Sequence, residues 1–421
     1  MTDMTTAMAP GEAAMGAAAP VREQDRIKAL DVVRGLALLG ILAVNAVYFA
    51  APFQAAQNPL LAPIPIDEGT LWSWFAMHVF FEFKMITLFS MLFGASIYLV
   101  GGERSDKERG RVLHRRLLWM VLFGVIHGAL IWYGDILLIY ALTGLLVMFA
   151  RSWRPATLFI VGGILLVLGT ALFAGMGAAL QYAPTEALEQ MRAEMWAPSA
   201  EEIERQIAAY QAGALSATQE NLNSWLDFLG YIPMFMIRTA GVMMIGMALF
   251  KTGFFSGRSP YWVYAVTALI GAAALLAVAY QALLNWQLRF DFLHMITAGN
   301  FANTALSIFV SLFYASLLIM LVKAGALRVL TEPLAAVGRM AFTNYIAQSL
   351  IMTTIFYGGR GFGLWGEVDR PTLWAIVLAI WAAQLIWSPL WLSRFQMGPL
   401  EWLWRRLSYA RPVAMGKTAA S

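Results

Sequence analysis

The chain has no cysteine, and only 13% of its 421 residues are charged. The absence of cysteine excludes disulfides, thiolate nucleophiles and cysteine metal sites. Histidine is also scarce, and its four scattered residues argue against a zinc site. We therefore expect no metal and no permanently bound cofactor. A soluble domain carries roughly 25% charged residues, so this composition indicates another class of protein.

Apolar residues make up 60% of the chain and gather in runs of about 18–25, the length that crosses a bilayer as a helix. The sequence predicts an all-α, polytopic transmembrane helix bundle with about ten spans. The run at 117–150 is too long for one span and is expected to break at Gly134 and Asp135. The expected spans lie at about 30–52, 74–100, 117–133, 136–150, 155–180, 228–250, 261–284, 301–322, 337–357 and 372–390.

Basic residues orient these spans. With alternate loops assigned inside and outside, 22 of the 29 Lys and Arg residues fall on one face, which the positive-inside rule makes cytoplasmic. An even number of spans then places both termini in the cytoplasm. The net charge of +4 is thus an orientation signal, and we expect a lipid bilayer as partner and no nucleic acid.

Three regions follow along the chain. Residues 1–20 have no compact apolar core and predict a disordered tail. Residues 21–390 predict a single bundle, with an acidic extracytoplasmic loop at about 181–223 that contains a short amphipathic helix. Residues 391–421 predict a basic cytoplasmic tail lying at the membrane interface, in which Glu401 faces inward toward the basic cluster.

Ionisable residues inside a membrane are costly, so each is a functional candidate. Lys84 lies well inside the second span, too deep for its side chain to reach the interface easily. It is expected to hold an anion or act as a catalytic cation, or else to pair with Glu82 or Asp135. Arg238, near the middle of the sixth span, is expected to bind a carboxylate or phosphate, or to join two helices.

His127 and Asp135 are the candidate acid–base pair. Neutral histidine is a natural proton shuttle or nucleophile, although it can also simply pack between helices. Eight residues separate the two, about 12 Å on a continuous helix, so they are expected to line one cavity without touching. His78, at the start of the second span, is expected to be an interfacial residue.

Other polar side chains in the spans are expected either to bind substrate or to join helices. Asp31 and Arg34 are three residues apart, so they can pair on one helix face, and Gly35 allows another helix to approach. A polar stripe is expected along the ninth span. These further candidates are Asn45, Arg339, Asn344 and Gln348.

Five ordered segments carry a resemblance to a known family: RIKALDVVRGLALLGILAVN, FKMITLFSMLFGAS, GVIHGALIWYGDILLIYALTG, GRMAFTNYIAQS and MGPLEWLWRR. Together they resemble the YeiB family of bacterial inner-membrane proteins, whose C-terminal half is a domain of unknown function. The resemblance runs from about residue 26 to 407. It implies a multi-pass protein of the bacterial inner membrane.

The first segment is also similar to the start of transmembrane acyltransferases, which pass an acyl group from cytoplasmic acyl-CoA to an acceptor across the membrane. By that resemblance Asp31, Arg34 and Gly35 match the shared LD-x-x-RG start. The heparan-glucosaminide acetyltransferase type among them uses a histidine just after the first span, where residues 53–70 here have none. His127, or failing that His78, is then expected to take its place.

Two functions therefore stay open, with a receptor or scaffold role as a third. The first is an acyltransferase that uses acyl-CoA, with His127 as base or transient acyl carrier oriented by Asp135 and Lys84 stabilising negative charge. The residues expected to attract its phosphates are Arg34, Arg111, Arg115, Arg116 and Arg339. The second is a transporter of a small organic anion, in which Lys84 and Arg238 form the site and His127 and Asp135 a proton path. The sequence does not decide the substrate or the oligomeric state.

Overall fold

The computed structural model describes residues 27–61, 63–180 and 182–416, and their regular structure is almost entirely helical, as expected. The predicted tail at 1–20 and the last five residues lie outside these ranges. In chain order the elements are α1 (Lys28–Ala50), α2 (Phe53–Gln57), α3 (Glu68–Phe80), α4 (Lys84–Gly101), α5 (Lys107–Ile126), η2 (His127–Ile131), α6 (Leu137–Val147), η3 (Met148–Ala150), α7 (Pro155–Leu180), α8 (Thr185–Met195), α9 (Ala200–Gln211), α10 (Ala214–Leu229), α11 (Ile232–Lys251), α12 (Tyr261–Gln287), α13 (Phe292–His294), η4 (Met295–Gly299), α14 (Phe301–Lys323), α15 (Arg328–Arg339), α16 (Ala341–Phe356), α17 (Arg370–Arg394) and α18 (Pro399–Tyr409).

Eight helical segments of the described chain are long and apolar enough to cross a membrane. They coincide with eight of the ten expected spans. The other two expected spans are also helical but shorter, because α6 and η3 together cover only 137–150 and α16 has 16 residues. The protein is therefore an all-α membrane protein with about eight candidate spans.

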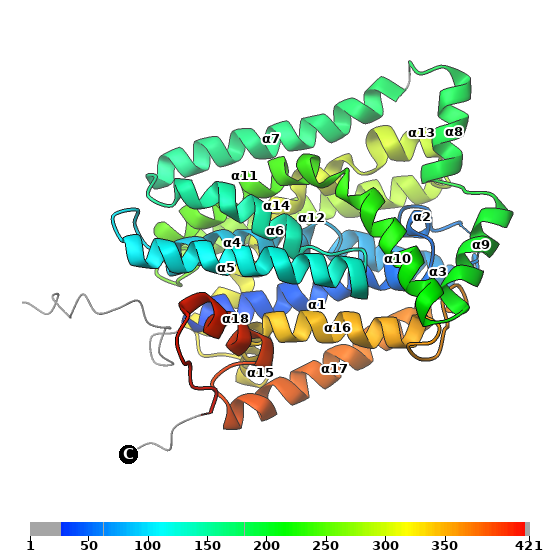
Figure 1. Cartoon of the computed structure of the whole chain (residues 1–421). Helices are drawn as coiled ribbons and strands as arrows, with labels where there is room; N and C mark the ends of the chain where they lie inside the picture. The colour runs from blue at the N-terminus through cyan, green and yellow to red at the C-terminus, as the bar shows by residue number, and fades with distance from the viewer. Residues whose placement is uncertain (1–26, 62, 181, 417–421) are drawn as a thin grey trace, which may run out of the picture.

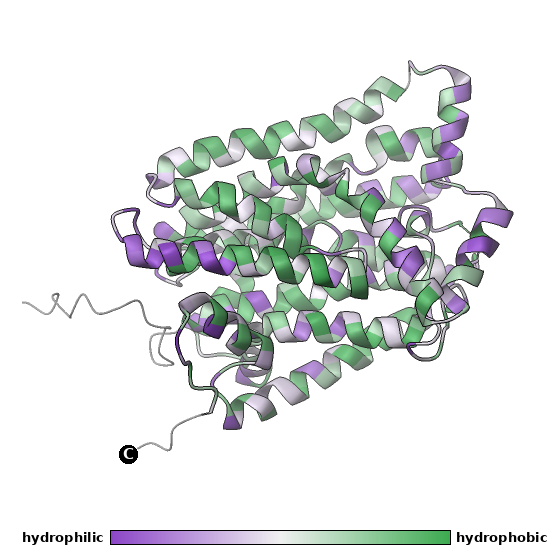
Figure 2. Ribbon diagram, in the orientation of Figure 1, coloured by the Kyte–Doolittle hydropathy of each residue, from purple (hydrophilic) through white to green (hydrophobic). Residues whose placement is uncertain are grey.

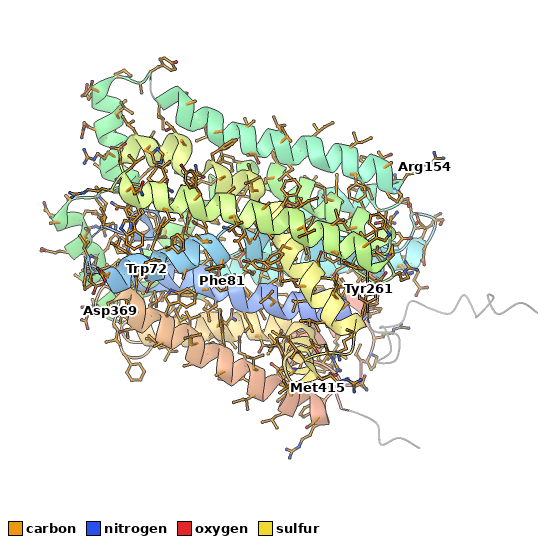
Figure 3. The ribbon with its side chains drawn as sticks, turned by 180° about the vertical axis from the view of Figure 1, so that it is seen from behind. Trp72, Phe81, Arg154, Tyr261, Asp369 and Met415 are labelled. Atoms are coloured by element: carbon orange, nitrogen blue, oxygen red, sulfur yellow. The ribbon has the colours of Figure 1, made fainter. Side chains whose placement is uncertain are left out.

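The long helices lie alongside one another and give the bundle two distinct ends (Figure 1). Arg154, Tyr261 and Met415 lie at one end, and Trp72 and Asp369 lie at the other (Figure 3). This grouping separates the segments predicted to be cytoplasmic from those predicted to be outside. We call the first the basic end and the second the acidic end. Which of them faces the cytoplasm stays a prediction from the charges.

The segment between α7 and α11 is more ordered than expected. Instead of one short amphipathic helix it forms three helices, α8 to α10. Figure 2 shows that α8 and α9 are largely hydrophilic, in contrast to the apolar helices of the bundle. The third, α10, packs against η2 and so reaches into the bundle.

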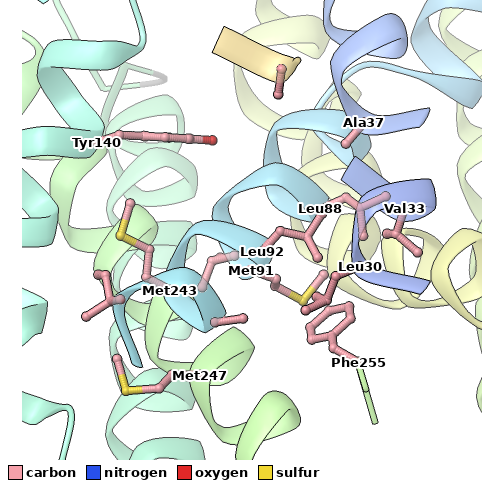
Figure 4. Packing of buried hydrophobic residues seen from close by; sticks show 14 of the residues in the cluster. Leu30, Val33, Ala37, Leu88, Met91, Leu92, Tyr140, Met243, Met247 and Phe255 are labelled. Carbon is pink, nitrogen blue, oxygen red and sulfur yellow. The ribbon is translucent and has the colours of Figure 1, made fainter. Parts of the chain in front are cut away.

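Small residues allow the central helices to pack closely. Gly94 of α4 lies against the backbone of Met243, and Gly246 of α11 lies against the backbone of Met91. Without side chains at these positions the two helices approach backbone to backbone, a frequent device in membrane proteins. Figure 4 shows the buried methionines and leucines that fill the surrounding core.

Candidate functional site

The first polar centre forms where α5 ends. The helix changes at His127 into the five-residue π-helical turn η2, and the amide of Trp132 donates to the carbonyl of His127. Irregular π turns of this kind often occur at functional sites. The chain then reverses, so that α6 packs beside α5 with Leu138 against Gly124.

Asp135 is held rigidly at the start of α6. Its carboxylate accepts the amide hydrogens of Leu137 at 3.1 Å and Leu138 at 2.7 Å. The same carboxylate lies 2.8 Å from Nδ1 of His127. The expectation that these residues cannot touch was wrong, because it assumed one continuous helix where the chain in fact turns back.

Ser349 completes this centre from α16. Its Oγ lies 2.9 Å from Nε2 of His127, and the side chains of Ser349, His127 and Asp135 are all almost fully buried. We call this set the His127 triad. Sequence reasoning missed Ser349, since a single serine in an apolar helix is common and its partner lies 222 residues away in the chain.

The contacts of the triad fit one arrangement of protons, in which Asp135 is ionised. An ionised carboxylate only accepts hydrogen bonds, so Asp135 receives the Nδ1–H of His127. Nε2 then carries a lone pair and accepts the hydroxyl hydrogen of Ser349. The arrangement is that of a nucleophile, a base and an orienting acid, the set that activates serine for acyl transfer.

Aromatic rings enclose the triad. The ring of Tyr345 lies 5.0 Å from that of His127, and the ring of Trp132 lies 6.3 Å away. Within the described part of the chain, the buried indole N–H of Trp132 has no hydrogen-bond partner. A residue next to the triad therefore has a buried donor that no described group satisfies.

From the acidic end, α10 covers the triad. The side chain of Asn221 donates to the carbonyls of Gly128 and Ala129 and accepts the amide hydrogen of Tyr133. Arg360 donates to the carbonyl of Ile131 at 2.9 Å. These bonds satisfy backbone groups that the π turn leaves free, and they tie α10 to the triad.

A second polar centre lies at the break between α3 and α4. The predicted second span is interrupted because Phe83 has a φ of 60°, so Lys84 begins a new helix instead of lying deep within one. Fully buried Lys84 donates to the carbonyl of His78 at 2.7 Å and to the side-chain oxygen of Asn303. Neither expected ion pair of Lys84 occurs among the described contacts.

His78, expected to be an interfacial residue, is buried within the protein, and its Nδ1 lies 2.5 Å from the carboxylate of Glu82. Arg238 of α11 reaches the same break, and its acceptors among the described residues are neutral. It donates to Ser307 at 2.6 Å and to Thr87, one turn along α4, at 3.3 Å. We call this set the Lys84 cluster; its members are Lys84, Asn303, His78, Glu82, Arg238, Thr87 and Ser307. The described contacts of Lys84 and of His127 belong to two separate networks.

The remaining candidates lie outside both networks. Asp31 and Arg34 form the predicted pair at 2.8 Å, and Gly35 packs against the backbone of Leu334. Asn45 is half-buried in α1. Asp31 and Arg34 therefore pair within α1, and Gly35 allows α1 to pack closely against α15.

The predicted polar stripe of the ninth span does not exist as one helix face, because the helix breaks at Met340. Arg339 ends α15 and donates to the carbonyl of Gln396 at 3.1 Å. Asn344 and Gln348 lie on α16 and bond side chains of α17, with Gln348 donating to Gln384 at 2.8 Å. Their described role is to join helices.

Glu401 binds the start of α16. Its carboxylate accepts the amide hydrogens of Phe342 at 2.7 Å and Thr343 at 3.1 Å, and the Thr343 hydroxyl at 2.6 Å. These are groups that a helix start leaves unpaired. Burial raises the pKa of Glu401 above its usual value.

The basic end holds a cleft of about 370 Å³. Arg154, Lys251 and Arg258 line it together with Trp153. At the same end Arg116 lies over the ring of Trp404, 4.0 Å from its centre, and so anchors α18 on α5. Among the described residues no group of three His, Asp or Glu side chains is placed to hold a metal.

Known proteins resemble this chain over nearly all of its length. It is 33% identical to the uncharacterized protein YeiB of Escherichia coli K12, over 94% of this chain and all of that one, and 31% identical to the uncharacterized protein YxaH of Bacillus subtilis 168, over 95% and 99%. Residues 249–411 match the family described as protein of unknown function DUF418. No solved structure matches. The chain thus belongs to the YeiB family of polytopic membrane proteins.

Proposed function

We propose that this protein is an acyltransferase of the bacterial inner membrane, which takes an acyl group from cytoplasmic acyl-CoA. The observation that carries the proposal is the contact of His127 with Asp135, buried in the bundle. A carboxylate that fixes the histidine tautomer leaves the other nitrogen free to act as a base. Acyl transfer to a hydroxyl or amine needs such a base.

The charge distribution supports an acyl-CoA donor. The first half of α5 carries Arg111, Arg115 and Arg116 and lies at the basic end, as do the start of α1, which carries Arg34, and α15, which carries Arg339. Guanidinium groups bind phosphates well, so this end suits the nucleotide of coenzyme A. If the basic end is cytoplasmic, as the positive-inside rule predicts, the donor arrives from the correct side.

The depth of the base sets a further requirement. The 20 residues of α5 separate His127 from the basic end, a rise of about 30 Å. The donor must therefore extend its acyl arm far into the bundle. The acceptor has the shorter route, from the acidic end, where α10 covers the base.

The test is to incubate the purified full-length protein with acetyl-CoA and with palmitoyl-CoA, and to measure release of the free thiol of coenzyme A. We expect release by the wild-type protein, at a rate at least about 10²-fold lower for His127→Gln, since a positioned base contributes about 10²–10⁴-fold. If neither donor is bound or turned over, the proposal falls.

The Lys84 cluster favours a second candidate, transport of a small organic anion. Lys84 is a buried cation and Arg238 a half-buried one, and both donate to neutral oxygens. Asn303 links Lys84 to a single carboxylate, that of Glu82, and an excess of cations over acids inside a bundle favours a bound anion. The discriminating measurement is flux of labelled acetate or phosphate into proteoliposomes. Transport predicts a flux that Lys84→Met abolishes, whereas acyl transfer predicts none.

A further inference from the structure

We propose that Ser349 is the nucleophile of this protein and carries the acyl group covalently between donor and acceptor. The proposal rests on the proposed acyl transfer and adds a residue and an intermediate to it. The central observation is the 2.9 Å distance between Ser349 Oγ and His127 Nε2, together with the 2.8 Å contact of His127 with Asp135. The three side chains of the His127 triad are thus already in contact, from Asp135 through His127 to Ser349.

The hydrogen bonds of α16 distinguish Ser349 from Thr353 and Thr354, which follow it in that helix. A serine or threonine in a helix ordinarily donates to a carbonyl three or four residues earlier. Thr354 does so at 2.8 Å and Thr353 at 3.2 Å. The corresponding distance from Ser349 to the carbonyl of Tyr345 is a long 3.4 Å, and the imidazole is nearer. The nearer acceptor for its proton is therefore the imidazole, and the Tyr345 carbonyl is the more distant one.

In the first step, Ser349 Oγ attacks the thioester carbonyl of the acyl donor while its proton moves to His127 Nε2. The bond between carbonyl carbon and sulfur then breaks, and the thiolate takes this proton. In the second step, an acceptor hydroxyl gives its proton to His127 and attacks the ester on Ser349. The ester bond breaks and the serine oxygen recovers the proton, so atoms and charges balance and nothing is oxidised or reduced.

Trp132, whose ring lies 6.3 Å from that of His127, offers a donor for the negative charge of both steps. Attack on a carbonyl places that charge on oxygen, and a preorganised donor in a dry site stabilises it. Trp132, stacked on Phe49 at 4.0 Å, keeps its indole N–H buried without a partner among the described residues. A bound carbonyl oxygen would supply the missing acceptor.

A covalent carrier also suits the position of the triad. Donor and acceptor enter from opposite ends of the bundle in the proposed function, and α10 closes the acceptor side in this structure. With an acyl-serine, the two substrates need not be present together. The acceptor reacts only after coenzyme A has left.

The test uses a lipophilic fluorophosphonate, which labels activated serines without needing the natural acyl donor. We expect full-length protein in detergent to be labelled on the peptide that contains Ser349. Labelling is expected to disappear in Ser349→Ala and to slow at least about 10²-fold in His127→Gln. Thr353→Ala, which removes a buried hydroxyl one turn along α16, is the matched control and keeps the label.

Release of coenzyme A from acetyl-CoA and palmitoyl-CoA, measured on the same samples, separates the two proposals. Equal labelling of Ser349→Ala and wild type would overturn the proposal that Ser349 is the nucleophile and acyl carrier. Turnover that persists in Ser349→Ala also overturns it, and leaves direct transfer by His127. Labelled Ser349 without turnover of either donor supports the nucleophile but removes acyl-CoA as its donor. Absence of both label and turnover removes both proposals.

Discussion

At the scale of single residues, the molecule is organised by buried polar groups. His127 and Asp135 could be chosen from the sequence, because ionisable side chains in a membrane are rare and costly. Their contact could not be predicted, since it depends on the π turn and chain reversal between them. Ser349 could not be chosen either, because only the packing of α16 beside η2 brings it to the imidazole.

Glu401 gives a pH prediction at this scale. Its pKa is raised in the folded protein by burial, so the folded state binds a proton more readily than the unfolded state. Its contribution to stability must then rise as the pH falls through the folded pKa, and level off below the ordinary value of 4.5. We expect the melting temperature of wild type, relative to Glu401→Gln, to increase on acidification. A difference that shrinks on acidification would contradict this.

At the scale of elements, α16 depends on a cap supplied by α18. Removing the three acceptor contacts in Glu401→Ala is expected to cost about 0.5–2 kcal/mol, as for other helix caps. Glu401→Gln keeps an acceptor oxygen and is expected to lose less. Because α16 carries Ser349, the alanine variant is also expected to turn over acyl-CoA more slowly. Chemical denaturation in detergent measures the stability, and equal loss in both variants would reject the capping role.

The contact of α10 with η2 gives a second prediction at this scale. A Cβ atom at Gly128 would overlap the indole of Trp225. We therefore expect Gly128→Ala to lower the melting temperature. The double variant with Trp225→Ala is expected to lose less than the sum of the two single changes, because the overlap disappears. Additive losses would show that the two residues do not meet.

Most helices could be predicted from the sequence, because a long apolar segment in a bilayer must satisfy its backbone hydrogen bonds internally and so forms a helix. The breaks inside them were not. The residues at the two breaks are Phe83, in the left-handed conformation, and Met340, and neither is a glycine or a proline. Both breaks lie beside buried polar groups, so tertiary contacts there override the preference of the local sequence for a continuous helix.

At the scale of the whole molecule, the central prediction is orientation. The chain has no cysteine, so single cysteines can be introduced without a background. Leu215 on α10 and Val329 on α15 are each 86% exposed and belong to opposite ends of the bundle. We expect an impermeant maleimide to label Leu215→Cys in intact spheroplasts and Val329→Cys only after permeabilisation. The reverse pattern would place the basic end outside.

The account depends most on the His127 triad, and one comparison tests it directly. The initial rate of coenzyme A release is measured for wild type, Asp135→Asn and the control Thr353→Ala. Asparagine can still accept backbone hydrogens, but its amide donates to Nδ1 and prevents Nε2 from acting as a base. We predict a rate about 10²–10⁴-fold lower for Asp135→Asn, with the control unchanged. Equal rates for wild type and Asp135→Asn would contradict the account.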